Sequence, residues 1–258
     1  MSSNPYATPK AAVADAPAPQ GEFVPGGKGV PAARGWNWLA DGWTLFKAAP
    51  GLWIGMIVVF VVILFALALV PFLGPVAQNL LMPVFMGGIA LGCRAIDDGS
   101  GLQFNHLFEG FKTRFGTLVA VGALYLAGFV AILVVVMMIT GASVFGLFMA
   151  GAQPDVQSTG AALGIMLAVL IVLALTLPLV MAIWFAPALV VFHDLGAVDA
   201  MKQSFTGCLR NVLPFLVYGI IGFVFAVVAS LPIGLGWLVL GPVIAASVYT
   251  SYRDIYLR

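Results

Sequence analysis

Four long apolar runs, each free of charged side chains, dominate the pattern of hydrophobic and polar positions along the chain. They extend over residues 48–93, 115–154, 156–192 and 211–252. A helix needs about 20 apolar residues to cross the hydrocarbon of a bilayer. The first and last runs are therefore long enough for two crossings each, and the two middle runs for one each. The pattern predicts an all-α, polytopic membrane protein with six transmembrane helices.

The six predicted spans form three hairpins, with expected bounds 52–71 and 76–94, 116–139 and 161–192, and 212–232 and 235–252. The fourth span is longer than a crossing requires and contains Pro178 and Pro187, each of which removes a backbone donor. We therefore expect a kinked helix, with the part after Pro187 emerging on the inner side.

An amphipathic helix is predicted before each hairpin, over 36–49, 102–115 and 197–211. Large apolar side chains recur there at spacings of three and four, with polar residues on the opposite face, as in helices that lie in the plane of a membrane surface. The predicted membrane-interface residues are Trp36, Trp43, Phe46, Phe104, Phe108, Phe111, Met201 and Phe205.

These three units resemble one another. Aligning the two later amphipathic helices matches Gly110 with Gly207, and a looser third copy places Gly42 at the same point. The second helices of the first and last hairpins also share a spacing, because Pro83 and Pro242 each lie eleven residues before an arginine. The pattern indicates an internal repeat of one amphipathic helix followed by one hairpin.

The basic residues are confined to one set of connections. All eleven Lys and Arg lie in the segments that would face one side, and the connections around 71–79, 140–160 and 232–236 contain none. Cytoplasmic loops hold the excess of Lys and Arg, so both termini are expected to be cytoplasmic. Seven of these residues ring the expected inner boundary: Lys47, Arg94, Lys112, Arg114, Lys202, Arg210 and Arg253. They either determine topology or contact anionic lipid, and the similar number of acidic residues favours the first interpretation.

Composition supports the same class. The chain is 62% hydrophobic and 8% charged, whereas soluble domains carry about 25% charged residues. The net charge of +1 gives no indication of a nucleic-acid partner. Residues 1–33 are rich in Pro, Ala and Gly and are predicted to form a disordered cytoplasmic tail before a membrane domain over 34–258. The NPYATP motif at 4–9 is either an ordinary part of that tail or a docking segment for a protein partner, and the first interpretation is favoured.

The predicted spans contain few residues that could take part in catalysis, metal binding or proton transfer. Every Asp, Glu, Lys, Arg and His lies at or outside the end of a predicted span, although proton pumps and many transporters need a charged residue within the membrane. His106 and His193 lack the neighbouring ligands of a metal site, and no nucleophile–base set or phosphate loop is evident. We therefore expect no cofactor and no enzyme activity.

Two functions remain. The protein is either a non-catalytic scaffold or lipid-interacting membrane protein, or a permease or channel for a neutral or amphiphilic solute. A solid apolar core would favour the first, and a polar lumen between the spans the second. The oligomeric state stays open.

Three stretches carry a resemblance to a known group of proteins: RGWNWLADGWTLFKAAPGLW at 34–53, GCRAIDDG at 92–99, and FAPALVVFHDLGAVDAMKQSFTGCLRNVLPFL at 185–216. Together they resemble an uncharacterised family of bacterial six-span inner-membrane proteins over residues 34–258. The layout is also similar to the membrane region of some glycerophosphodiester phosphodiesterases, whose soluble catalytic domain has no counterpart here. The resemblance implies a fold and a location in the bacterial cytoplasmic (inner) membrane, with no reaction.

Overall fold

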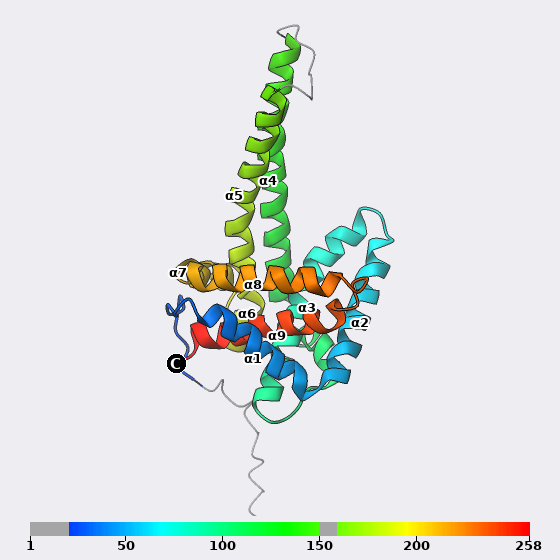
Figure 1. Cartoon of the computed structure of the whole chain (residues 1–258), viewed down its shortest axis with the longest axis vertical. Coiled ribbons are helices and arrows are strands. Elements are labelled where there is room, and N and C mark those ends of the chain that lie inside the picture. Colours follow the sequence, from blue (N-terminus) through cyan, green and yellow to red (C-terminus); the bar gives the residue numbers. More distant parts are fainter. Residues whose placement is uncertain (1–20, 150–158) are drawn as a thin grey trace, which may run out of the picture.

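The computed structural model describes residues 21–149 and 159–258, and almost all of this part of the chain is helical (Figure 1). The elements in chain order are α1 (Arg34–Ala48), α2 (Pro50–Ala68), α3 (Leu73–Asp97), the 3-10 helix η1 (Phe104–Phe111), α4 (Phe115–Met149), α5 (Thr159–Trp184), α6 (Ala186–His193), α7 (Ala197–Arg210), α8 (Val212–Ser230) and α9 (Trp237–Tyr256).

Among the described residues, five helical segments are long and apolar enough to cross a membrane: Pro50–Ala68, Leu73–Asp97, Phe115–Met138, Met166–His193 and Val212–Ser230. They fit a multi-pass membrane protein. The predicted sixth span, 235–252, coincides with most of α9, which is not among them. The second half of α9 carries Ser247, Thr250 and Ser251 and is largely buried, so its composition reflects packing inside the protein as well as contact with lipid.

Two boundaries differ from those that the sequence predicts. Helix α4 continues to Met149, so the connection predicted over 140–160 begins inside a helix. The fourth predicted span is broken after Trp184. The break precedes Pro187 because a proline fits the first turn of a new helix, where its missing N–H is not needed.

A side chain from α7 accounts for the position of that break. The Ser204 hydroxyl donates to the Met181 carbonyl at 2.7 Å and accepts from the Phe185 N–H at 2.9 Å. These two backbone groups, four residues apart, would bond each other in a continuous helix. Ser204 therefore replaces one rung of the helical ladder, which is a recognised cause of a helix kink.

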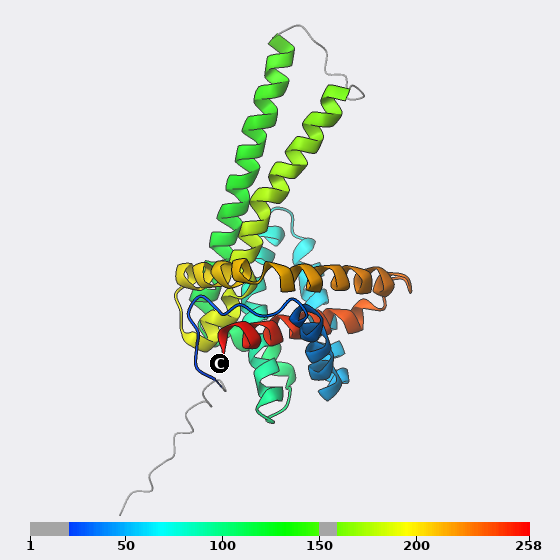
Figure 2. The same ribbon diagram turned by 60° about the vertical axis from the view of Figure 1, so that its left-hand side comes forward.

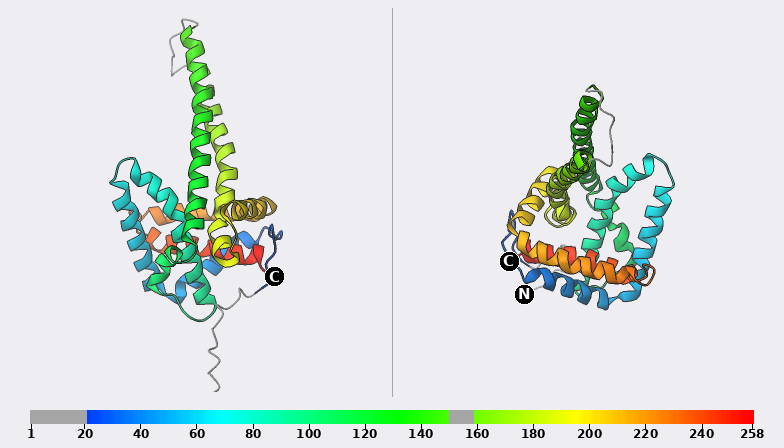
Figure 3. Two further views of the ribbon diagram at one scale, coloured as in Figure 1. Left: turned by 180° about the vertical axis from the view of Figure 1, so that it is seen from behind. Right: turned by 45° about the horizontal axis from the view of Figure 1, so that its top comes forward.

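The three hairpins leave the rest of the molecule in different directions (Figure 3). The α4–α5 hairpin rises well beyond the other elements, and α8 runs across its lower end in two views that differ by 60° (Figures 1 and 2). Hairpins α4–α5 and α8–α9 are therefore not parallel, and the structure does not by itself give six parallel crossings.

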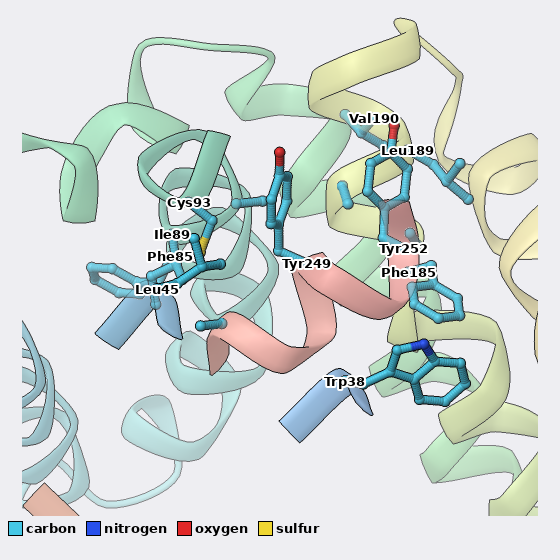
Figure 4. Packing of buried hydrophobic residues seen from close by; sticks show 14 of the residues in the cluster. Trp38, Leu45, Phe85, Ile89, Cys93, Phe185, Leu189, Val190, Tyr249 and Tyr252 are labelled. Atoms are coloured by element: carbon cyan, nitrogen blue, oxygen red, sulfur yellow. The ribbon is translucent and has the colours of Figure 1, made fainter. Parts of the chain in front are cut away.

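The remaining elements form a packed unit that we call the base. It consists of α1, η1, α6 and α7, the C-terminal end of α3 and most of α9, which contact one another across the sequence. Its core contains large buried side chains, among them Trp38, Phe85, Phe185 and Tyr252 (Figure 4). Helix α1 lies along α9, so the first and last helices of the described chain are neighbours.

The three matched glycines all lie where helices approach closely. A Cβ at Gly110 would collide with the Val84 carbonyl of α3, and one at Gly42 would lie 2.7 Å from the Val243 carbonyl of α9. A Cβ at Gly207 would collide with the Tyr256 hydroxyl. The matched position of each repeat is therefore the point where its amphipathic segment packs against α3 or α9.

The segment before α1 is ordered by the opposite end of the chain. Phe23 pairs with Leu257 in an isolated antiparallel bridge, and the Val24 N–H donates to the Tyr256 carbonyl at 2.8 Å. The Asn211 side chain accepts from the Val30 N–H at 2.8 Å.

The prediction of a disordered tail over 1–33 is therefore wrong from residue 21 onwards. Local composition missed the segment because the contacts that order it come from residues near 211 and 256. Residues 1–20, including the NPYATP motif, lie outside the described part of the chain.

Candidate functional site

Most of the basic residues predicted at the inner boundary have an acidic partner close by. Arg94 pairs with Asp98 and Lys112 with Glu109, each at 3.5 Å, Arg114 pairs with Asp194 at 2.5 Å, and Arg253 pairs with Asp97. Arg210 instead donates to the Gly27 carbonyl at 2.5 Å. Within the described residues, the structure gives no ion pair for Lys47 or Lys202. Local pairing weakens any general attraction of the base for anionic lipid, which supports a structural and topological role for most of these residues.

Two of the paired arginines share a cavity. Arg94 and Arg253, which the Pro-to-Arg spacing matches, both line a cavity of about 210 Å³ where the ends of α3 and α9 meet α6. We call it the aromatic cavity; its other lining residues are Asp97, Asp98, Phe192, Tyr249, Tyr252 and Leu257.

The aromatic cavity combines balanced charge with three rings. The Arg94 guanidinium lies 5.5 Å from the centre of the Phe192 ring, and the rings of Tyr249 and Tyr252 are 6.2 Å apart. Figure 4 shows these two tyrosines on one face of α9 with their hydroxyls pointing to the same side. Two arginines and two aspartates leave the cavity without net charge at neutral pH.

A second cavity, the basic cavity, adjoins the first through the shared residues Arg253 and Leu257. Its volume is about 220 Å³, and its other lining residues are Lys28, Arg34, Asp254 and Arg258. Four basic side chains line it beside one carboxylate. Arg253 is paired with Asp97, and Arg34 with Asp254 and Asp41, so the cavity keeps a net positive charge from Lys28 and Arg258. Such a site attracts phosphate or carboxylate groups.

Asp254 is the acceptor that holds one wall of the basic cavity. Its carboxylate accepts from Arg34 Nε at 2.7 Å and from the indole N–H of Trp38 at 2.9 Å. Lys28 Nζ donates to the Leu257 carbonyl at 2.8 Å. These bonds join the segment before α1, α1 itself and the end of α9.

The two histidines take part in packing and capping. His193 stacks on Phe23 with ring centres 3.9 Å apart, and its Nε2 lies 2.5 Å from the Tyr252 hydroxyl. His106 Nδ1 accepts from the Gln103 N–H at 3.0 Å and caps η1. Burial lowers the pKa of His106, which favours the neutral ring that this bond needs.

The predicted membrane-interface side chains differ in exposure. Trp36 and Trp43 are 48% and 44% exposed, and Phe104 and Phe111 also reach the surface. Phe46, which the sequence also places on the exposed stripe, is buried beneath Trp43 with ring centres 5.3 Å apart. Its assignment to the membrane interface is therefore wrong, because α1 packs its apolar face on α9 and only the margin stays open. Phe108, Met201 and Phe205 are half-buried.

The hairpins present a very different surface. Large apolar side chains are exposed along α2, α4, α5 and α8, for example Phe65, Val130, Leu173 and Phe223. The two described hairpin tips are apolar as well, with Phe72 91% and Ile233 98% exposed. A surface of this kind is stable in lipid and not in water.

Sequence reasoning missed the acidic and aromatic residues of the aromatic cavity. The sequence places Asp97 and Asp98 only within the GCRAIDDG stretch, and Tyr249 and Tyr252 within the last predicted span. One signal was available: Tyr249, Tyr252 and Tyr256 recur at spacings of three and four at the end of the last apolar run, which places them on one helical face.

Comparison with known proteins supports the resemblance to inner-membrane proteins. The model of a family described as a domain of unknown function, DUF7847, matches residues 37–252. A probable inner membrane protein of Burkholderia thailandensis is 29% identical over 229 residues, which cover 85% of this chain and 82% of that protein. No solved structure matches the chain. The comparisons do not show the similarity to phosphodiesterase membrane regions. Since the family model covers most of the chain, the protein belongs to the DUF7847 family.

Proposed function

We propose that this protein is a non-catalytic, lipid-interacting protein of the bacterial cytoplasmic membrane, with the base at the cytoplasmic surface and the hairpins in the bilayer. The observation that carries the proposal is the contrast between the two surfaces. The hairpins expose apolar side chains, while the ion pairs and both cavities lie in the base. The related protein of Burkholderia thailandensis, named as a probable inner membrane protein, is consistent with this location.

The orientation follows from the distribution of charge. All Lys and Arg residues precede α1 or lie in α1, the base and its loops, and positive residues are retained on the cytoplasmic side. We therefore place both termini inside and the three hairpin tips outside, which is the six-span layout that the sequence predicts.

Helix α8 is the predicted span whose length and direction most restrict a six-span layout. It is apolar on all sides, as expected for a helix immersed in hydrocarbon and unlike an amphipathic surface helix. With 19 residues it is about 28 Å long, so it can cross the hydrocarbon only when nearly upright. It runs across α4–α5 in Figures 1 and 2, so six complete crossings require the two hairpins to align more closely in the bilayer.

The distribution of buried polar residues favours lipid interaction over a permease. Among the side chains that the structure describes, the fully or almost fully buried polar ones are Ser204, Asn211, Ser247, Thr250 and Ser251. They belong to the base and to the half of α9 that packs against it, and each makes hydrogen bonds to neighbouring groups. They therefore stabilise internal packing. Within the described residues, the buried side-chain atoms without a hydrogen-bond partner are Thr176 Oγ1 and Trp184 Nε1, both in α5, whereas a solute pathway needs a series of available polar groups along the spans.

Reconstitution of the whole protein into vesicles that contain a spin-labelled phospholipid and entrapped glycerol tests the proposal. We expect a motionally restricted lipid population and a rate of glycerol release equal to that of protein-free vesicles. Faster release that scales with the amount of protein would favour the permease. The absence of restricted lipid would contradict the proposed function.

A further inference from the structure

We propose that the two adjoining cavities of the base together bind a small zwitterion that carries a phosphate and a primary ammonium, such as the headgroup of phosphatidylethanolamine or free phosphoethanolamine. The inference rests on the proposed function, because it names the lipid chemistry that the base recognises. It follows from the different chemistry of the two cavities and from the residue that joins them.

The basic cavity fits the phosphate. Lys28, Arg34, Arg253 and Arg258 line it against one carboxylate, Asp254. That carboxylate is already engaged by Arg34 and the Trp38 indole. Lys28 Nζ donates to the Leu257 carbonyl, so the phosphate would be held mainly by the guanidinium groups of Arg253 and Arg258. Arginine binds phosphate through charge-assisted, often bidentate hydrogen bonds.

The aromatic cavity fits the ammonium. Asp97 and Asp98 supply carboxylate acceptors, and the Tyr249 ring supplies a face that attracts a cation. Phe192 stacks on Tyr252, and Tyr252 on Tyr256, so these rings form the wall behind Tyr249. The volume of about 210 Å³ suits a small headgroup fragment, without the acyl chains of a lipid. Arg94 is held by Asp98 and by the Phe192 ring, which leaves Asp97 as the carboxylate for the ligand.

Arg253 and Asp97 explain why the ligand should be a zwitterion. In the structure they form an ion pair, with side chains 43% and 23% exposed, at the boundary of the two cavities. A partly exposed pair of this kind contributes little to stability, so a ligand can separate it. A phosphate bound to Arg253 releases Asp97, and an ammonium on the same ligand then takes the place of the arginine. A simple anion would leave Asp97 without a cationic partner, with only the hydrogen bond from Tyr249, and a simple cation would leave Arg253 without an anionic one.

Lipid-retention mass spectrometry of the full-length protein tests this inference. The protein is exposed in detergent to an equal mixture of phosphatidylethanolamine, phosphatidylcholine and phosphatidylglycerol with the same acyl chains. We expect phosphatidylethanolamine to be retained several-fold above its share. Phosphatidylcholine is the matched comparison, since its methylated ammonium cannot donate a hydrogen bond to Asp97.

Three variants test which residues are responsible for the preferential retention of phosphatidylethanolamine. Asp97→Asn should reduce the retention of phosphatidylethanolamine to its share in the mixture. Arg258→Gln, which changes an exposed side chain outside the Arg253–Asp97 pair, should weaken that retention even if Asp97→Asn fails to fold. Glu109→Gln removes a carboxylate from an exposed ion pair away from both cavities and should retain phosphatidylethanolamine as the wild type does.

Titration with free phosphoethanolamine distinguishes a lipid headgroup from a soluble molecule as the ligand. Selective retention of the lipid assigns the site to a headgroup, and saturable binding of the free compound without lipid selectivity assigns it to a soluble ligand. Either result supports the inference if Asp97→Asn abolishes it. Equal retention of phosphatidylglycerol without saturable binding of free phosphoethanolamine, or a preference that is unchanged in Asp97→Asn, overturns it. A protein that keeps bound lipid without selectivity and does not bind free phosphoethanolamine fails only this inference, whereas one that retains no lipid fails the proposed function too.

Discussion

At the scale of single residues, the closest contacts of the base are made by glycines whose missing side chain allows two helices to touch. Adding a methyl group at Gly110 or Gly207 forces a neighbouring carbonyl or tyrosine to move. Overpacking of this kind costs about 1–3 kcal/mol, more than the roughly 1 kcal/mol by which alanine favours a helix over glycine.

We therefore predict that Gly110→Ala and Gly207→Ala lower the thermal unfolding midpoint of the protein in detergent. Gly222→Ala in α8 is the matched control, because nothing lies within 4 Å of its added Cβ, and it should leave the midpoint unchanged or raise it. Equal thermal unfolding midpoints for all three variants would contradict the close helix contacts at Gly110 and Gly207.

Asp254 provides a second prediction at this scale. Asp254→Ala leaves the fully buried Trp38 indole N–H without its acceptor, and an unsatisfied buried donor costs about 1–3 kcal/mol. Glu109→Ala removes an ion pair whose lysine is 67% exposed, which is worth about 0–1 kcal/mol. Chemical unfolding in detergent should therefore show a clearly larger loss for Asp254→Ala. A smaller loss than that of Glu109→Ala would remove Asp254 as the link between α1 and α9.

At the scale of elements, the break between α5 and α6 depends on a side chain from another helix. Ser204→Ala removes the hydroxyl that serves both the Met181 carbonyl and the Phe185 N–H, and we predict a loss of about 1–3 kcal/mol. Thr206→Ala in the same helix is the control, since its exposed hydroxyl bonds only the Lys202 carbonyl. Denaturant unfolding of the two variants measures the difference. If the Ser204→Ala and Thr206→Ala variants were equally stable, Pro187 alone would determine where the helix breaks.

Two neighbouring rings of α1, Trp43 and Phe46, allow packing inside the protein to be distinguished from contact with lipid. Phe46→Ser opens the core and should cost several kcal/mol, as buried Phe truncations do (about 3–5 kcal/mol for Phe→Ala). Trp43→Ser should leave stability in detergent nearly unchanged. In bilayers, Trp43→Phe should reduce the quenching of fluorescence by lipids brominated near the headgroup, whereas Trp53→Phe, which removes a buried indole, should not.

Unchanged quenching in Trp43→Phe, together with a stability loss in Trp43→Ser equal to that of Phe46→Ser, would assign Trp43 to internal packing. Single substitutions distinguish the two roles because the structure places only one of the two rings at the surface.

At the scale of the whole molecule, the sequence predicted the positions of the elements better than their arrangement. The uncharged runs located α2, α4 and α8 because hydrocarbon length and composition are local properties. The pairing of α1 with α9 and the order of the segment at 21–33 depend on contacts between opposite ends of the chain, which no local pattern contains. The direction of α8 also depends on such contacts.

The candidate site was likewise predictable from the sequence only in part. The matched Pro-to-Arg spacings identified Arg94 and Arg253 as related positions, and the structure places both in one cavity. The sequence did not indicate that Asp97, Tyr249 and Lys28 would join them, because these residues come from three segments that meet only in the folded base.

The side of the membrane on which each surface lies tests the account most directly. Single cysteines introduced as Ser100→Cys, Gly196→Cys and Leu235→Cys can be labelled in intact cells with a maleimide that does not cross the inner membrane. Cys93 and Cys208 are buried, and burial raises the pKa of Cys208 to about 12, so the native thiols should add little background.

The account predicts that Leu235→Cys is labelled from outside, while Ser100→Cys and Gly196→Cys are labelled only after the cells are opened. Labelling of Ser100→Cys or Gly196→Cys in intact cells would contradict a cytoplasmic base, and protection of Leu235→Cys would contradict a complete crossing by α8 and α9.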